Sequence, residues 1–170
     1  QQLHDICQLS LYTGMRVGEV FNLNWNDIDL EHGCISIKDP KSGGNRNAYI
    51  TPPLRKLFHQ IKSSNPVAKG LIFKNSKGKK IREISNAFNR TVERLGFNKD
   101  ITDRRDKVVA HTLRHTFASW LAMQGETIIT IQKLMGHSNL EMTLRYAHLS
   151  PSHERDAFIK LAEGNSDKII

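Results

Sequence analysis

Cysteine is scarce in this sequence, and long apolar runs are missing altogether. The two cysteines, Cys7 and Cys34, are too few and too far apart for a disulfide framework or a cysteine-based metal site. No apolar stretch approaches the roughly 20 residues that a membrane-spanning helix needs, and the N-terminus has no signal-peptide pattern. These absences predict a soluble, cytoplasmic protein without a membrane partner.

Acidic residues are outnumbered by basic ones. Lysine and arginine number 25 against 17 aspartate and glutamate residues, which gives a net charge of +8 and a pI near 9.7. This balance favours a polyanionic partner, although ordinary enzymes, ribosomal proteins and membrane-surface proteins can share it. The 170 residues are enough for one compact domain. Because the chain opens at Gln1 already in helical register, we expect that it is a fragment of a longer protein.

Apolar periodicity predicts a mainly α-helical domain of the α+β class, with one small antiparallel β-sheet. We expect helices ending near Gly14, over 18–23, 54–61, 84–95, 111–124 and 128–135 and from Ser150, with strands over 34–38 and 48–51 flanking a hairpin tip at 42–45. Ser138 and Glu141 should form a capping box for a further helix that carries Tyr146. Residues 164–170 form a polar tail.

The helix that begins near His111 should have an apolar stripe with a polar seam beside it. The stripe consists of Leu113, Phe117, Trp120 and Leu121. At about 100° per residue, His111, Arg114 and His115 fall in one sector next to this stripe. His111 and His115 also have the i, i+4 spacing of zinc ligands, but no glutamate lies between them and Arg114 would repel a metal ion. We therefore expect a polar cluster at the edge of the core.

Other familiar metal and nucleotide motifs fail on spacing. Asp27, Asp29 and Glu31 imitate the start of a calcium loop, but Gly33 comes one residue late and Lys38 stands where the bidentate glutamate belongs. The glycines of the hairpin tip lack the spacing of a phosphate-binding loop. We expect neither a metal ion nor another cofactor.

Six residues stand in short sequence words that follow one another in a fixed order. They are Arg16 in TGMRVGE, Lys41 in the hairpin, His111 and Arg114 in HTLRHT, His137 in LMGHS, and Tyr146 in MTLRYAH. Together these words resemble the tyrosine recombinase (phage integrase) family, over most of the chain from about Thr13 to His148. Glu19 lies three residues after Arg16, close enough to orient its guanidinium, although such a spacing alone is usually a surface ion pair.

The resemblance implies a role in DNA strand cleavage for each of these residues. Arg16 and Arg114 would clamp the phosphate, His111 and His137 would support them, Lys41 would be the general acid, Tyr146 would be the nucleophile, and Glu19 and His115 would be supporting residues. Arginines suit a phosphate clamp because they stay charged and bond oxygens in pairs. A tyrosine with a pKa near 10 needs a base, for which His111 is our candidate, while His137 would bond the phosphate.

The departing 5′ oxygen also needs a proton, which a lysine can supply. Lys41 is the candidate for this role, and Lys38 lies close to it in the sequence. The resulting phosphotyrosine would store the energy of the broken bond for rejoining the strands, so the scheme requires no ATP.

The resemblance implies that residues 1–163 are the catalytic domain of a bacterial or phage-encoded site-specific recombinase. It would cleave and rejoin double-stranded DNA through a covalent 3′-phosphotyrosyl intermediate, as a homotetramer on two duplexes, with an N-terminal DNA-binding domain absent from this fragment. Two alternatives remain: a non-catalytic helix-turn-helix protein built on 117–125 and 127–134, and a type IB topoisomerase. The first leaves Arg16, Lys41 and Tyr146 without a role, and the GHS word favours a recombinase over the second.

Overall fold

The computed structural model describes residues 1–38, 44–64, 67–84, 86–151, 159 and 161. The elements in these ranges are α1 (Gln2–Thr13), α2 (Val17–Asn22), η1 (Trp25–Asp27), β1 (Ile28–Asp29), β2 (Cys34–Lys38), β3 (Asn45–Tyr49), α3 (Pro52–Ser64), α4 (Asn86–Arg94), α5 (Ala110–Met123), α6 (Ile128–Met135), α7 (Glu141–Leu144) and η2 (Ala147–Leu149). The expected α+β class, mainly helical with one small antiparallel sheet, is confirmed. Within the same ranges, no helix has the length and apolar character to cross a membrane.

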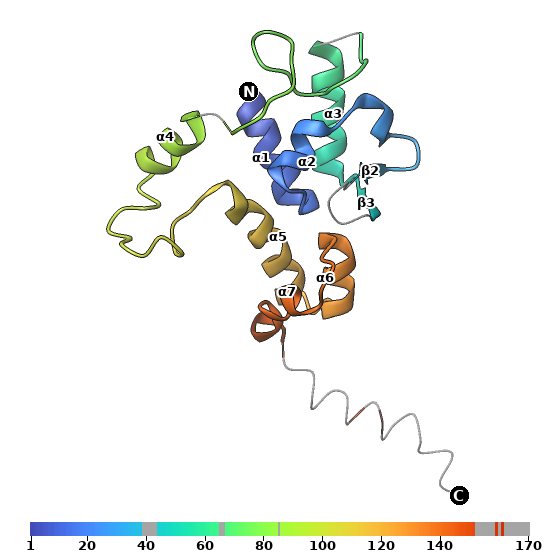
Figure 1. Ribbon diagram of the computed structural model, residues 1–170. Coiled ribbons are helices and arrows are strands. Elements are labelled where there is room, and N and C mark those ends of the chain that lie inside the picture. Colours follow the sequence, from blue (N-terminus) through green and yellow to red (C-terminus); the bar gives the residue numbers. More distant parts are fainter. Residues whose placement is uncertain (39–43, 65–66, 85, 152–158, 160, 162–170) are drawn as a thin grey trace, which may run out of the picture.

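One half of the molecule is built around the small sheet. Its three antiparallel strands lie in the order β1-β2-β3. Ile35 and Ile37 of β2 are buried in the same core as Leu54 and Phe58 of α3. Figure 1 shows α1, α2 and α3 gathered next to these strands. This half supplies the N-terminal part of the site described below.

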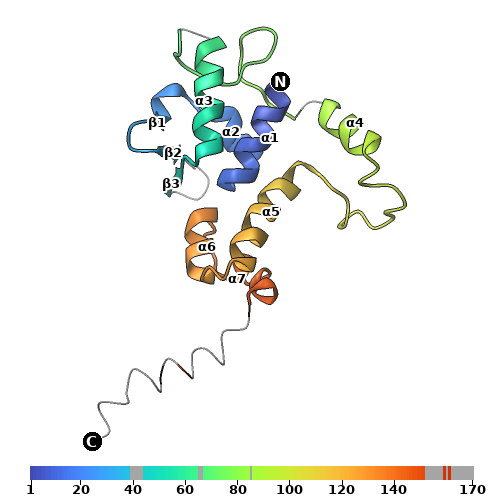
Figure 2. The ribbon, with the colours of Figure 1, turned by 180° about the vertical axis from the view of Figure 1, so that it is seen from behind.

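The other half consists of α5, α6, α7 and η2. Its small core contains Ala118, Ala122, Ile131, Met135 and Tyr146. Helix α1 packs against α5 and so joins the two halves. Figures 1 and 2 show α4 set to one side of both.

Two left-handed glycines end helices at the junction between the halves. Gly14 follows α1 with φ 65°, and its amide bonds the Ser10 carbonyl at 3.0 Å. Gly136 follows α6 with φ 63°. Thr127 caps the start of α6 by accepting a hydrogen bond from the Thr130 amide. Both helix ends were expected from the glycines, and both are confirmed.

The expected apolar stripe of α5 is wrong in its details. The residues of α5 that are buried are Arg114, Ala118 and Ala122, whereas Trp120 is 42% exposed. Phe117 and the other two stripe residues are only half-buried. The physical reason is close packing, since small side chains let α5 approach α6 and leave room for a buried guanidinium.

The expected capping box before Tyr146 is also wrong. The side chain of Asn139, not Ser138, accepts the Glu141 amide at 3.0 Å, and Leu140 is at the N-cap position. Helix α7 ends at Leu144, so Tyr146 lies just beyond it and not within it. An Asn side chain two residues before the amide satisfies the same backbone group that a serine cap would.

The hairpin differs from expectation in its second strand, which begins at Asn45 and not at residue 48. The strand Ile28–Asp29 was not predicted, because two residues give no periodicity. Residues 42 and 43 of the expected tip, and most residues of the helix expected from Ser150, lie outside the described residues.

Candidate active site

Arg114 is the most deeply buried charged side chain of the described residues. Only 1% of it is exposed, and it donates from Nη1 to the Gly14 carbonyl and from Nη2 to the Met135 carbonyl, each at 2.5 Å. Desolvation and the nearby Arg16 lower the pKa of Arg114 to about 10. It therefore remains positively charged at neutral pH, and its position is fixed by backbone groups from both halves of the molecule.

The carboxylate of Glu19 gathers the arginines of the site. It accepts the Arg16 backbone amide at 2.8 Å and the Arg16 Nη1 at 3.0 Å. Arg114 Nη1 lies 4.0 Å from Glu19 Oε2. Burial alone would raise the pKa of Glu19, but hydrogen bonds and charge from Arg46, followed by those from Arg16 and Arg114, hold this pKa below its usual value. The expected pairing of Arg16 with Glu19 is present, and it is more than a surface ion pair because Glu19 is 9% exposed.

Arg46 of β3 belongs to the same cluster and was missed by sequence reasoning. It donates from Nη2 and Nη1 to the two Glu19 oxygens at 2.7 and 3.0 Å. The signal that could have found it is the alternation in β3, since Arg46 shares a face with the buried Ala48. An arginine on the inward face of a short strand requires a buried acceptor.

Three histidines and a tyrosine complete the group. Nδ1 of His115 and the hydroxyl of Tyr146 share a hydrogen bond of 2.5 Å. The rings of His111 and His115 meet edge to face at 4.6 Å between centroids. His137 Nδ1 is bonded to Thr143 Oγ1 at 2.9 Å. The residue in contact with the Tyr146 hydroxyl is thus His115, which was expected to be supporting, and not His111.

The local electrostatics keep the histidines neutral. Desolvation, with the charge of Arg114 among the further causes, lowers the pKa of His115 and of His137 to about 4 each. The pKa of His111 is lowered by the same two causes. Burial raises the pKa of Tyr146, and the opposing charges of Arg145 and Arg114 do not overcome it. In this state the site holds neutral imidazoles beside a neutral phenol.

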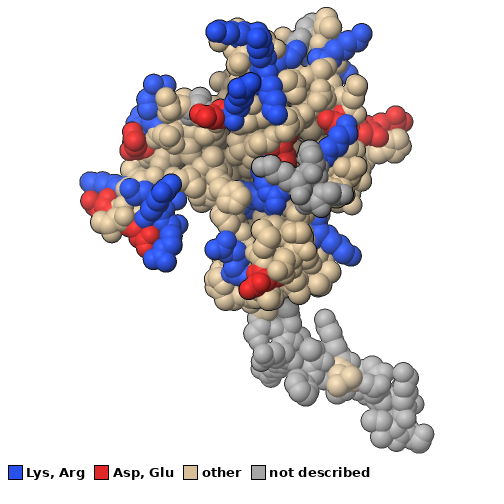
Figure 3. Space-filling model, in the orientation of Figure 1, with Lys and Arg blue, Asp and Glu red and all other residues tan. Residues whose placement is uncertain are grey.

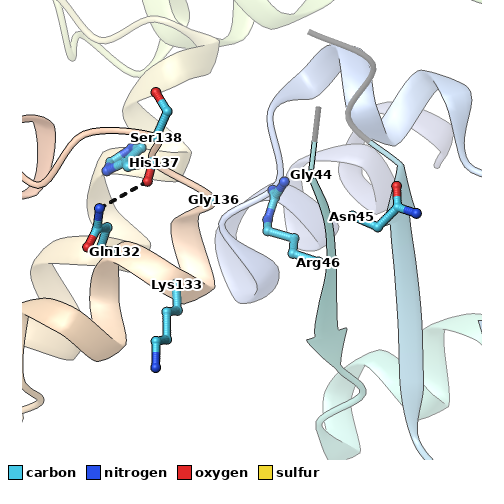
Figure 4. A pocket seen from close by; sticks show the side chains of 8 residues that line it. All are labelled: Gly44, Asn45, Arg46, Gln132, Lys133, Gly136, His137 and Ser138. Carbon is cyan, nitrogen blue, oxygen red and sulfur yellow. Dashed lines mark hydrogen bonds between the residues drawn. The ribbon is translucent and has the colours of Figure 1, made fainter. Parts of the chain in front are cut away.

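These side chains surround a cavity of about 180 Å³. Its lining consists of His111, Arg114, His115, Met135, His137, Glu141, Met142, Arg145 and Tyr146. This volume is below the roughly 300 Å³ at which small-molecule sites begin, and it suits a group the size of a phosphate. A neighbouring hollow of about 460 Å³ lies between β3 and α6, and His137 lines both (Figure 4).

The structure describes only one of the two hairpin lysines. Lys41 lies outside the described residues. Lys38 donates to Asp27 Oδ1 at 2.7 Å, and Asp27 is buried. Asp27 also accepts the Asn24 amide at 3.0 Å, and the Lys38 side chain that pairs with it is 70% exposed.

Basic side chains also dominate the surface around this region. Figure 3 shows more Lys and Arg than Asp and Glu on the face drawn, both over the sheet half and over the α4 segment. In the part of the chain that the structure describes, no three His, Cys, Asp or Glu side chains converge as metal ligands would. Fold and site together define a helical domain in which arginines, histidines and one tyrosine surround a phosphate-sized cavity.

Comparison with known proteins places this arrangement in a family. Residues 2–153 match the phage integrase family. Tyrosine recombinase XerA of Saccharolobus solfataricus is 32% identical over 163 residues, covering 96% of this chain and 51% of its own length. The integrase of Salmonella phage P22 is 30% identical over 167 residues, covering 90% of this chain and 41% of its own length. The chain belongs to the phage integrase family.

Solved structures agree with this assignment. The catalytic domain of bacteriophage HP1 integrase has a TM-score of 0.69 and 29% identity, over 95% of this chain and 83% of that one. The Tn1549 transposon integrase in complex with a circular intermediate DNA has a TM-score of 0.73 at 22% identity, over 94% of this chain and 58% of that one, which shows likeness of fold. The chain spans about half the length of the curated relatives it matches first.

Proposed function

We propose that this chain is the catalytic domain of a tyrosine-type site-specific recombinase, which cleaves and rejoins double-stranded DNA through Tyr146. The proposal rests on how the polar side chains around Tyr146 are arranged. The Tyr146 hydroxyl is bonded to His115 and lines the same phosphate-sized cavity as the buried Arg114 and as His137. A core tyrosine needs none of these polar neighbours.

In the proposed reaction, Arg16 and Arg114 hold the nonbridging oxygens of the scissile phosphate. Negative charge builds on these oxygens as the phosphorus gains a fifth ligand, and fixed guanidinium groups stabilise it without reorganising. Arg114 suits this role because two backbone carbonyls and the nearby Glu19 fix its position. His137 has Nδ1 bonded to Thr143, which leaves Nε2 to donate to the phosphate.

The hydroxyl proton of Tyr146 is transferred to a histidine as the Tyr146 oxygen attacks the phosphorus. Sequence reasoning put His111 in this role, and the 2.5 Å contact supports His115 for it. The Oη–P bond forms, the bond from phosphorus to the 5′ oxygen breaks, and the 3′ phosphate stays on the tyrosine. His111 would then support His115 through the edge-to-face ring contact.

The 5′ oxygen leaves with a proton from a lysine, for which we propose Lys41. The ion pair between Lys38 and Asp27 supports this choice over Lys38, since a lysine held by a buried carboxylate is a poor donor to DNA. Rejoining reverses each step: the 5′ hydroxyl attacks the phosphotyrosine and returns its proton to the lysine. The scheme uses no metal ion and no ATP.

We also propose that the catalytic unit comprises residues 1–163, with 164–170 as a tail, and that it acts as a homotetramer on paired DNA sites. The support for a DNA substrate is the net charge of +8 and a relative solved with DNA. XerH, whose structure is described as bound to difH substrate, is 28% identical to this chain with a TM-score of 0.67.

Formation of a covalent adduct tests the proposed function. The protein as its gene encodes it is incubated with nicked duplexes tiling the DNA that flanks the gene, and adducts are detected on a denaturing gel. We expect one with a 3′ phosphate on Tyr146 and a free 5′ hydroxyl. Tyr146→Phe should keep the fold, losing about 1 kcal/mol from one hydrogen bond, and should form no adduct.

Tyr12→Phe is the matched control, because Tyr12 packs on Trp120 at 6.3 Å between ring centroids, away from the cavity. It should form adduct at the wild-type rate. An adduct that peptide mapping places on another tyrosine, or no adduct from the wild-type protein on any duplex, would contradict the proposal. Relaxation of supercoiled plasmid without site preference would favour a topoisomerase instead.

A further inference from the structure

Arg46 links three elements of the structure: β3, α2 and α6. It belongs to β3, its guanidinium bonds Glu19 of α2, and its Nε donates to the Leu134 carbonyl in the last turn of α6 at 3.2 Å. We infer that Arg46 is a positioning residue for strand cleavage: it fixes the Glu19 carboxylate that orients Arg16 and Arg114 toward the phosphate. This inference rests on the proposed function.

The geometry of the Glu19 pair is that of a two-point clamp. Both oxygens are bonded by the two terminal nitrogens of Arg46, and only 10% of the Arg46 side chain is exposed. Bidentate pairing fixes the plane of the carboxylate as well as its position. Glu19 also accepts a hydrogen bond from Arg16 Nη1, and Nη1 of Arg114 lies 4.0 Å from Glu19 Oε2.

Charge balance explains why Glu19 must be held by Arg46. Glu19 is a single anion beside Arg16, Arg46 and Arg114. Without Arg46 it would be free to turn both oxygens toward the two guanidinium groups that we assign to the phosphate. An intramolecular carboxylate would then compete with the DNA for the same donors. Arg46 limits this competition because it bonds both oxygens, which leaves one hydrogen bond from the Arg16 guanidinium to Glu19.

The same side chain also braces the turn that leads to His137. Arg46 bonds the Leu134 carbonyl and Arg114 bonds the next one, that of Met135. A Cβ placed on Gly136 would lie 2.8 Å from Arg46 Cδ, so the guanidinium arm lies directly against the turn. Figure 4 shows β3 with Arg46 on one wall of the hollow and α6 with the His137 turn on the other.

A plain structural role makes a different prediction from a positioning role. A buried ion pair that only stabilises the fold, once lost, lowers the amount of folded protein and leaves the rate per folded molecule unchanged. A positioning residue changes that rate, and its effect depends on Glu19 being present. A double-mutant cycle between Arg46 and Glu19 separates the two.

The experiment measures the single-turnover rate of adduct formation on the nicked duplex identified above, at saturating protein. The rate is divided by the fraction of folded protein, which circular dichroism measures. Arg46→Met should slow adduct formation by about 100-fold, the scale of a misplaced reacting group. In a Glu19→Gln background the further loss should be no more than about 3-fold, because Arg46 then has no carboxylate to hold. Arg46→Lys should recover only part of the rate, since an ammonium cannot bond both oxygens in one plane.

Arg55→Met is the matched control, because Arg55 of α3 also holds a loop carbonyl, that of Leu30, but touches no site residue among those described. It should lower stability without slowing cleavage. A wild-type rate for Arg46→Met, equal losses in both backgrounds, or full rescue by Arg46→Lys would overturn the positioning role. Absence of adduct from the wild-type protein would instead defeat the proposed function, so the two failures are distinguishable.

Discussion

At the scale of single residues, the site depends on a charged side chain that is almost fully buried. Arg114 is 1% exposed, and its guanidinium is stabilised by two carbonyl dipoles with Glu19 nearby. Removing one partner of such a buried group leaves the other unsatisfied, which commonly destabilises a protein by 3 to 5 kcal/mol. Burial of Arg114 costs desolvation free energy, and it also strengthens the electric field of the guanidinium, because little solvent screens the charge.

The hairpin lysines can be distinguished by changing the leaving atom. A 5′-bridging sulfur leaves without a proton, so Lys41→Ala should cleave the oxygen substrate slowly and the sulfur substrate at close to the wild-type rate. Arg114→Ala should be slow on both, since charge still builds on the nonbridging oxygens. Single-turnover adduct formation on the two substrates provides the measurement.

Lys38→Ala is the control for that comparison. It breaks the ion pair with Asp27 and should lower stability, but it should cleave both substrates normally. If the sulfur substrate rescues Lys38→Ala and not Lys41→Ala, the general-acid role belongs to Lys38. If it rescues neither, another group protonates the 5′ oxygen.

Sequence reasoning reached most of the described site residues because each stands in a short local word. His111, Arg114 and His115 share a helix sector, and the structure places all three at one cavity. Sequence reasoning chose His111 as the histidine that acts on Tyr146, whereas His115 makes the contact, because that contact joins α5 to a turn 31 residues further on. It also missed Arg46, whose partners Glu19 and Leu134 are 27 and 88 residues away.

At the scale of elements, the ends of helices do most of the positioning. Gly14, at the end of α1, presents its carbonyl to Arg114 and lies against Phe117 of α5. The end of α6 supplies the next carbonyl, from Met135, and the turn to His137. Glycines marked these ends in the sequence, whereas the burial of Arg114 and Ala118 on α5 was not predictable, because it depends on how closely α1 and α6 approach.

Gly14→Ala should test this junction. Its φ of 65° is unfavourable for alanine, and the added Cβ would lie 2.5 Å from Phe117 Cδ1. Gly78→Ala is the matched control, since Gly78 has φ 71° but open space around it. Both should lose about 1 to 2 kcal/mol from the left-handed backbone, and Gly14→Ala should lose a further 1 to 3 kcal/mol from overpacking.

Urea denaturation of both variants measures the difference in free energy of unfolding. Gly14→Ala should also slow adduct formation, because the Gly14 carbonyl holds Arg114. Equal destabilisation of the two variants would mean that Phe117 yields at no cost, and the close approach of α1 to α5 would then not be a constraint.

At the scale of the whole molecule, the neutral histidines couple stability to pH. His115 and His137 have a pKa of about 4 when folded, against about 6.5 when unfolded. Between these values the unfolded chain binds protons that the folded chain does not. Above pH 6.5 these histidines therefore do not reduce the free energy of unfolding, and as the pH falls toward 4 this free energy decreases. Glu19, whose pKa is lowered, acts in the same direction below about pH 4.5.

Denaturation by urea at pH 7.0 and pH 5.0 checks this coupling. We expect a lower free energy of unfolding at pH 5.0, and a smaller difference in His137→Asn, which keeps a polar group near Thr143 but cannot titrate. Equal stability at the two pH values in the wild-type protein would show that folding does not lower the pKa of these histidines.

If the proposed function is right, the net charge of +8 should govern the encounter with DNA, and one exposed lysine offers a way to measure where the duplex lies. Lys133 lines the hollow between β3 and α6, beside His137. If a DNA phosphate occupies this hollow, binding releases a counterion there, and Lys133→Ala should reduce the slope of log affinity against log salt by about 1.

Lys62, an equally charged and exposed residue in the last turn of α3, is the control, because that end of α3 lies far from α6 in both ribbon views (Figures 1 and 2). Lys62→Ala should leave the slope unchanged. Equal slopes for both variants and the wild-type protein would mean that the DNA backbone does not enter the hollow, and that Arg16 and Arg114 receive the scissile phosphate from another direction.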